Sequence, residues 1–248
     1  LPMTVFVRSS LSADGPTLAL ALLALAICLK PADPMAPSID AKARRRLFSV
    51  AALLSLGKPP YGAVSLLALA TPARFLGGMK RYLSAMLVLT VTIVAVQATW
   101  AFALRGKTVA WAPGADPQAQ LNYVVDQPLD AASFLVKDFL RSIPRLTHQA
   151  LGVLGWLDAP IPIPVAGFLG MLIVLVALGE PGAPPACAAF RWLGALIGIV
   201  GALALHAMNY VWWTPPGAPF VAGIQGRHLL PFVPFLFVAI GSPVWIAQ

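Results

Sequence analysis

Long runs of apolar residues, separated by short polar stretches, dominate the pattern along this chain. A helix needs about 20 largely apolar residues to cross a bilayer, within a range of about 17 to 25. Five runs reach or nearly reach this length: residues 15–31, 83–104, 163–179, 192–213 and 229–247. The pattern therefore predicts an all-α integral membrane protein, built as a polytopic helical bundle with about five full spans.

A sixth apolar run, residues 47–71, is interrupted by the sequence Gly57-Lys58-Pro59-Pro60-Tyr61. Each half holds only about 10 to 12 residues, too few to cross a core about 30 Å thick at 1.5 Å per residue. We expect two short helices that meet inside the membrane, or a re-entrant helical hairpin. Non-helical backbone is tolerated at that depth inside protein or beside a water-filled cavity, so Lys58 is expected to mark a cavity.

The longest stretch between spans, residues 105–162, is predicted to form an extracytoplasmic loop with a helix of its own. Within it, residues 130–143 place five apolar side chains at helical spacing: Phe134, Leu135, Phe139, Leu140 and Ile143. Lys137, Asp138 and Arg141 take the opposite face. This pattern predicts an amphipathic helix. The helix either lies on the membrane surface or packs against its own loop, and the sequence leaves both open.

Composition supports a membrane protein and excludes several other classes. The chain is 59% hydrophobic and 10% charged, against about 45–50% and about 25% in soluble domains. Its mean hydropathy is +0.81. These values exclude a water-soluble domain and a disordered tail. Two cysteines are too few for a disulfide framework, and Cys28 and Cys187 are expected to be small buried or loop residues.

The net charge of +8 is explained by membrane topology, because the charged residues lie between the apolar runs. No nucleic-acid partner is expected. One side of the membrane receives three loops: residues 30–46, 73–81 and 180–191. They carry nine Lys and Arg against three acids, a net of +6, and the other side carries seven against six, a net of +1. The positive-inside rule makes the side with Arg44, Arg45 and Arg46 cytoplasmic, so Asp14 and residues 223–230 face outward.

Two charged residues at the edges of apolar runs are candidates for chemistry. A charge at the bilayer centre costs about 2.5–3.5 kcal/mol on insertion scales, so Lys58 either binds an anion such as a lipid phosphate or snorkels to the interface. Asp14 precedes Gly15-Pro16, a pattern typical of a helix cap. It is also an acid facing the outer leaflet, able to act as a base or to bind a divalent ion, and the two roles are compatible. A single carboxylate is by itself a poor metal site.

A third candidate is the sequence Gly223-Ile224-Gln225-Gly226-Arg227-His228, directly before the last apolar run. Helix N-termini favour anions, and arginine presents a bidentate fork to phosphate. The glycines let the backbone approach a ligand closely. The alternative is that Arg227 and His228 anchor the chain at the interface. His206 is interpreted as a satisfied buried histidine, and His148 as a loop residue without an evident partner.

Several stretches, in order along the chain, resemble the bacterial family of predicted membrane proteins called domain of unknown function 2142 (DUF2142). The matching pieces are Pro2-Met3-Thr4 with Ser12-Ala13-Asp14, Gly57-Lys58-Pro59-Pro60-Tyr61, Asp116-Pro117-Gln118-Ala119-Gln120 with Gln127-Pro128, residues 152–162, and Gly223-Ile224-Gln225-Gly226-Arg227-His228. The chain departs from the expected pattern at His228, where the family prefers tyrosine, and at Ala159, where it prefers threonine. Each departure weakens a chemical role for that position.

The resemblance extends to the GT-C class of polytopic glycosyltransferases, which take sugars from polyprenyl-phosphate carriers. It implies a site for lipid phosphate or substrate formed by Lys58, Tyr61, Gln225, Arg227 and His228. It also implies that Asp14 is the candidate catalytic or acceptor-positioning acid. The implied partners are membrane lipid and a polyprenyl-phosphate sugar donor. No cofactor is evident, although a divalent metal would be compatible with this class.

The resulting hypothesis is a membrane glycosyltransferase-like protein that uses a polyprenyl-phosphate-linked sugar for cell-envelope polysaccharide or glycoconjugate synthesis. The alternative is non-enzymatic binding or transport of a lipid-linked saccharide. We expect residues 1–248 to be a single transmembrane domain in the bacterial inner membrane. Since the chain begins at Leu1 and not at Met, and its last apolar run reaches Gln248 with no polar tail, we also expect it to be an internal or C-terminal piece of a longer protein. By analogy with GT-C enzymes the general base would lie upstream, so the chain would be inactive alone.

Overall fold

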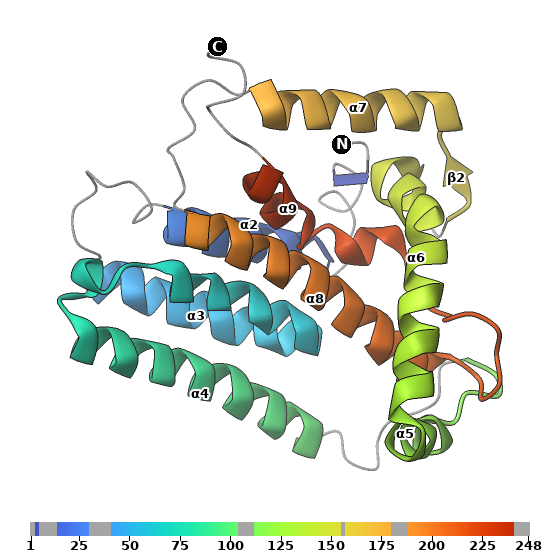
Figure 1. Ribbon diagram of the computed structural model, residues 1–248, viewed down its shortest axis with the longest axis horizontal. Helices are drawn as coiled ribbons and strands as arrows, with labels where there is room; N and C mark the ends of the chain where they lie inside the picture. The colour runs from blue at the N-terminus through green and yellow to red at the C-terminus, as the bar shows by residue number, and fades with distance from the viewer. Residues whose placement is uncertain are drawn as a thin grey trace.

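The computed structural model describes residues 3–4, 14–29, 41–103, 112–154, 157–179 and 188–240 of the chain. The protein is largely helical, as predicted (Figure 1). The elements, with η for a 3-10 helix, are α2 (Asp14–Leu29), α3 (Ala41–Gly57), η2 (Pro59–Ala70), η3 (Ala73–Leu76), α4 (Met79–Ala103), α5 (Pro117–Asp126), α6 (Pro128–Gly152), β1 (Val153–Leu154), β2 (Ala159–Pro160), α7 (Ile163–Gly179), α8 (Ala188–Trp213), η4 (Gly226–Leu229) and α9 (Val233–Ile240).

The helices α2, α3, η2, α4 and α8 lie side by side as a bundle, and α6 runs across one end of it (Figure 1). Two helices of the described part are long and apolar enough to span a membrane, α4 and residues 190–213 of α8. The apolar helices α2, η2 and α7 are shorter. The all-α character is therefore confirmed, while five full spans remain a prediction. The final predicted span is described only as far as α9, which ends at Ile240.

The core of the bundle is formed where α2, α3, η2, α4, α8 and α9 meet. Leu67 of η2, Leu89 of α4, Leu205 of α8 and Phe235 of α9 are fully buried there. Cys28 is also buried, as expected, and Cys187 lies outside the described residues. By contrast, most of α4 is exposed although its sequence is apolar. An apolar helix with this exposure is typical of one whose outer surface contacts lipid.

The interrupted run forms a hairpin of α3 and η2, as in the second of the two predicted arrangements, but its limbs are longer than expected. The break falls where it was predicted, at Gly57 to Pro59, but α3 begins earlier, at Ala41, and has 17 residues. It is therefore about 25 Å long. The second limb has 12 residues of 3-10 helix, which rises about 2.0 Å per residue and so spans about 24 Å. Lys58 consequently lies in the turn at the end of two nearly full-length limbs, not between two half-helices.

The 3-10 form of η2 fits its sequence. Pro59 occupies the first turn, where its missing N–H costs nothing. A 3-10 helix has three residues per turn, so every third side chain falls on one line. Tyr61, Val64 and Leu67 follow this spacing and are all buried. The next line begins at Gly62, where an added Cβ would lie only 2.5 Å from Ser55 Oγ of α3. This glycine therefore allows the two limbs of the hairpin to pack closely.

The predicted outer loop contains two helices, α5 and α6, that pack on the end of the bundle. The side chain of Asp116 caps α5 by accepting hydrogen bonds from the backbone N–H groups of Gln118 and Ala119, both at 3.0 Å. Gln120 then donates from Nε2 to the carbonyl of Thr214 at 3.1 Å, which joins α5 to the end of α8.

The amphipathic helix is confirmed and is longer than expected, as α6 covers Pro128–Gly152. It packs on α8 and η4 while Leu140 and Ile143 stay exposed. Asp138, expected on the solvent face, is instead buried.

Candidate functional site

Three segments that are distant in the sequence meet at the end of the bundle crossed by α6. They are the first turn of α2, the turn between α3 and η2, and the short helix η4. The Tyr61 hydroxyl donates a hydrogen bond of 2.9 Å to the carbonyl oxygen of His228, and its ring packs on Phe232 with a centroid separation of 5.6 Å. Tyr61 is buried, so this contact fixes η4 against the end of the α3–η2 hairpin.

An ion pair joins the first turn of α2 to η4. Arg227 Nε lies 3.4 Å from Asp14 Oδ2, and the two side chains are 15% and 16% exposed. The pair is therefore largely shielded but still open to a ligand. Asp14 is the first residue of α2, where a carboxylate also interacts favourably with the helix dipole. The two residues that the sequence offered as separate candidates are thus in contact with each other.

The charges of Lys58, Asp14 and Arg227 act on one another in this cluster. Burial lowers the pKa of Lys58 to about 8, an effect that Asp14 opposes and Arg227 reinforces. The lysine therefore stays largely protonated near pH 7. Burial also lowers the pKa of His228 to about 3, with a further lowering by Lys58. His228 is accordingly neutral near pH 7, and the two cations of the site are Lys58 and Arg227.

The ring of His228 is oriented by its own backbone segment. The backbone N–H of Gln225 donates to Nδ1 of His228 at 3.4 Å. This contact requires an unprotonated Nδ1, so the proton of the neutral ring is on Nε2. His228 thereby keeps one N–H donor for a ligand even though it carries no charge.

The short helix η4 packs closely on α6 through Gly226. The backbone N–H of Gly226 donates to Gln149 Oε1 at 2.9 Å. A Cβ at Gly226 would meet the Leu146 carbonyl oxygen, the Ala150 nitrogen and Gln149 Cβ, all nearer than 3.0 Å. Two of these three atoms belong to the backbone of α6 and cannot rotate away. Only glycine therefore lets η4 approach α6 closely enough to place Arg227 beside Asp14.

Replacing Gly226 by alanine is expected to push η4 away from α6 and to separate Arg227 from Asp14. The expected loss of stability is about 1–3 kcal/mol, the range for forcing extra volume into a packed contact. Thermal unfolding of the detergent-solubilised protein measures this loss. Gly167→Ala is the matched control, because nothing lies within 4 Å of a Cβ added there. Equal stability of the two variants would contradict the close packing of η4 on α6.

All six residues implied by the family resemblance lie in or beside this cluster. Lys58, Asp14, Arg227 and His228 interact through their charges, and Tyr61 hydrogen-bonds the backbone of His228. Gln225 precedes η4 as its N-cap residue. We define these six residues as the Lys58–Arg227 site. Sequence patterns marked Lys58, Asp14, Arg227 and His228 as separate candidates, and the resemblance added Tyr61 and Gln225. Neither indicated the Asp14–Arg227 pair.

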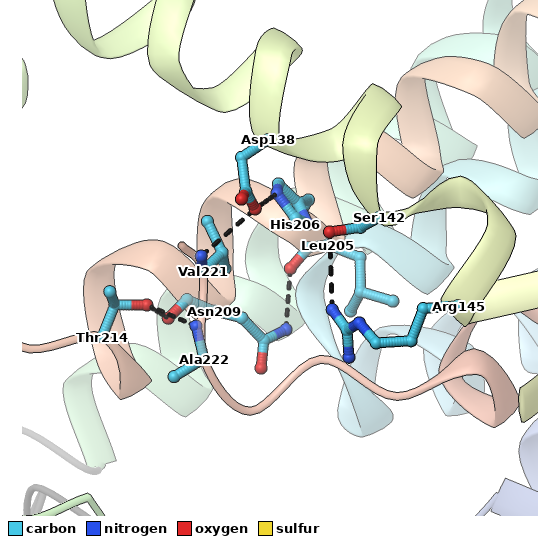
Figure 2. A network of polar contacts seen from close by, with 9 residues as sticks. All are labelled: Asp138, Ser142, Arg145, Leu205, His206, Asn209, Thr214, Val221 and Ala222. Carbon is cyan, nitrogen blue, oxygen red and sulfur yellow. Dashed lines mark hydrogen bonds and ion pairs between the residues drawn. The ribbon is translucent and has the colours of Figure 1, made fainter. Parts of the chain in front are cut away.

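A second polar network, which sequence reasoning missed, lies between α6, α8 and the chain after α8 (Figure 2). Asp138 Oδ2 lies 2.9 Å from His206 Nε2 and accepts a second hydrogen bond from the backbone N–H of Val221 at 3.1 Å. Both side chains are buried. Thr214 extends the network by accepting from the backbone N–H of Ala222 at 3.1 Å.

The interpretation of His206 as a buried histidine is confirmed, and its partner is Asp138. The sequence indicated this pair only weakly. Asp138 is an acid on the polar face of a predicted amphipathic helix, and His206 is a histidine within a predicted apolar helix.

The described residues do not gather three or more His, Cys, Asp or Glu side chains at one point. Asp14, the acid considered for a divalent ion, is engaged by Arg227. A carboxylate held by a guanidinium does not fit the oxygen-rich ligand set that magnesium or calcium requires.

Comparison with known proteins identifies the family. A family model described as predicted membrane protein (DUF2142) matches residues 1–236, nearly the whole chain. The chain therefore belongs to this family of predicted membrane proteins. Searches of curated proteins and of solved structures gave no match.

Proposed function

We propose that this member of the DUF2142 family binds the phosphate of a lipid-linked sugar at the Lys58–Arg227 site and serves glycosyl transfer at the cell envelope. The observation that carries the proposal is the convergence of Lys58, Arg227 and the neutral His228 on Asp14 at one end of an apolar bundle. A polyprenyl phosphate has an apolar tail and an anionic head. An exposed apolar helix such as α4 suits the tail, and the paired cations suit the head.

The ion pair defines how the head group would enter. Arg227 contacts Asp14 through Nε at 3.4 Å, and a phosphate can make a bidentate contact with the same guanidinium. A phosphate that lies between Lys58 and Arg227 would take the place of the carboxylate. Binding of the donor would therefore release Asp14 from Arg227 and leave its oxygens to accept a hydrogen bond from another group.

The transfer step assigns a role to each of these residues. The hydroxyl oxygen of the acceptor attacks the anomeric carbon of the donor sugar and forms the new glycosidic bond. The bond from that carbon to the phosphate oxygen breaks, and its electron pair leaves with the polyprenyl phosphate. Asp14 takes the proton of the acceptor hydroxyl, in place of the general base that the analogy with GT-C enzymes puts upstream. Lys58 and Arg227 stabilise the charge that develops on the departing phosphate. No step of the proposal uses a metal.

Charge distribution supports an extracytoplasmic position for the site. Arg44, Arg45 and Arg46 lie at the start of α3, and Lys58 follows the opposite end of the same helix. By the positive-inside rule, the arginine end is cytoplasmic in the bacterial inner membrane. The site then faces outward, on the side where envelope polysaccharides and glycoconjugates would be the acceptors.

Binding of farnesyl phosphate and of farnesol to the protein in lipid nanodiscs tests the proposal. Farnesyl phosphate is expected to bind and uncharged farnesol is not. Arg227→Gln should weaken farnesyl phosphate binding at least about tenfold, as the loss of a charged hydrogen bond implies. Asp14→Asn should strengthen it, because the amide no longer competes for Arg227. Equal binding of both compounds, or no response to Arg227→Gln, would contradict the proposal.

The second candidate, binding or transport of a lipid-linked saccharide without catalysis, draws on the same ion pair. Asp14 is engaged by Arg227. In this second function its carboxylate neutralises Arg227 while no lipid is bound and has no catalytic role. A transfer assay on the full-length protein separates the two functions. Catalysis predicts that Asp14→Asn abolishes sugar transfer while farnesyl phosphate still binds. Movement of the lipid across a vesicle membrane with its glycosidic bond intact would favour transport.

A further inference from the structure

An open pocket of about 670 Å³ lies beside the Lys58–Arg227 site, between α6 and the chain that leads from α8 to η4. One wall is the face of α6 that carries Asp138, Arg141, Ser142 and Arg145. The opposite wall is formed by residues 219–225, which end directly before η4. Leu157, in the turn between β1 and β2, completes the lining. This volume is large enough for a sugar ring, since ligand pockets commonly measure about 300–1,000 Å³.

The charge of the pocket is positive. Arg141 and Arg145 are one helical turn apart, so both point from the same face of α6, and both are exposed. Asp138 is the acid in the lining, but its Oδ2 is engaged by His206 and by the Val221 N–H. Arg145 Nη2 donates to Ser142 Oγ at 3.4 Å and keeps further N–H groups for a ligand (Figure 2).

The walls of the pocket are held in place by specific contacts. Asp138 fixes Val221, and Thr214 fixes Ala222. The lining residue Leu157 has a φ of 70°, a left-handed conformation that is rare for a residue other than glycine, asparagine or aspartate. Such strained residues are concentrated at ligand sites, where the surrounding structure maintains them. Phe220 at the rim is exposed and offers an apolar face to a sugar ring.

We propose that this pocket is a second ligand site, which binds the anionic group of a water-soluble saccharide through Arg141 and Arg145. The anionic group is a carboxylate or a phosphate, because a pair of guanidinium groups recognises both. The pocket adjoins the Lys58–Arg227 site and shares Gln225 with it, but its two arginines are separate from Lys58 and Arg227. It deepens the proposed function by giving the acceptor a class, an acidic saccharide, although the binding itself does not depend on sugar transfer.

Titration of the full chain in nanodiscs with glucuronate, inorganic phosphate and neutral glucose tests this inference by calorimetry. Glucuronate or phosphate is expected to bind saturably and glucose at least about tenfold more weakly. The double variant Arg141→Gln with Arg145→Gln should lose at least about tenfold in affinity. Lys137→Gln is the control for each single arginine replacement, since it removes one positive charge from an exposed position on α6 outside the pocket lining.

The variants also separate this site from the Lys58–Arg227 site. Arg227→Gln should leave glucuronate binding unchanged, and the double arginine variant should leave farnesyl phosphate binding unchanged. Both replaced arginines are exposed, so the variant is expected to unfold at the same temperature as the parent protein. The inference would be overturned if neither anion bound saturably. It would also be overturned if Lys137→Gln weakened binding as much as the double variant.

Discussion

Lys58→Ala is expected to remove phosphate-dependent lipid binding and to lower sugar transfer by the full-length protein about 100-fold while the fold is retained. A hydrogen bond to a charged group contributes about 1.5–3 kcal/mol, which corresponds to roughly a 10- to 150-fold change. The effect falls near the upper end because Lys58 is one of the two cations at the site. Its position in the turn, with the side chain half-buried, means that truncation opens no cavity in the core. Turnover with a defined polyprenyl-phosphate sugar is the measurement.

Two further variants separate charge from position. Lys58→Arg keeps the positive charge and should keep most of the binding. Lys80→Ala removes an exposed lysine at the start of α4, at the opposite end of the bundle, and should change neither binding nor transfer. Unchanged transfer by Lys58→Ala would show that this lysine only snorkels to the interface. Equal losses in Lys58→Ala and Lys80→Ala would indicate a general effect of net charge.

Asp138→Ala is expected to cost about 3–5 kcal/mol of unfolding free energy, because its carboxylate accepts two buried hydrogen bonds and each hydrogen bond to a charged group contributes about 1.5–3 kcal/mol. The substitution would leave His206 Nε2 and the Val221 N–H without the acceptor that both use. It would also release the segment that carries Val221 from α6. Denaturant unfolding of the detergent-solubilised protein measures the change.

Asp126→Ala is the control for this substitution, since Asp126 is exposed at the end of α5, and such surface changes usually stay within about 0.5 kcal/mol. Asp138→Asn should lie between the two, because the amide oxygen can still accept one of the hydrogen bonds. If Asp138→Ala and Asp126→Ala were equally stable, the network would contribute nothing to the fold. Glucuronate affinity should fall in Asp138→Ala as well, because the pocket wall is no longer fixed.

Local signals along the sequence predicted most of the helices and marked Lys58, Asp14, Arg227 and His228 as candidates. Tyr61 and Gln225 were added only by the family resemblance. Long apolar runs predict helices directly. Gly57 and Pro59 predict a break in the helix, because these residue types disfavour helix interiors. The start of α3 was missed because Arg44, Arg45 and Arg46 interrupt the apolar pattern that marks a span. Hydropathy also assumes the rise of an α-helix, so the 3-10 form of η2 was not predicted.

The contacts that assemble the two sites could not be predicted in the same way. Asp14 and Arg227 are at opposite ends of the chain, and nothing in their local patterns indicates that they meet. Asp138 lies between Lys137 and Phe139 on an amphipathic helix, where an acid ordinarily faces water. Its burial depends on α8 crossing α6 at His206. Such pairings are set by tertiary packing, which single-sequence periodicity does not report.

The three-residue turn of η2 restricts how the length of this segment can change during evolution. Tyr61, Val64 and Leu67 share one buried line, and inserting a single residue would rotate everything beyond it by about 120°. Insertion or deletion of three residues would preserve the line and alter the limb by about 6 Å. Homologous chains adapted to bilayers of different thickness should therefore vary here in steps of three residues, whereas α3, with 3.6 residues per turn, can keep its buried face with steps of either three or four.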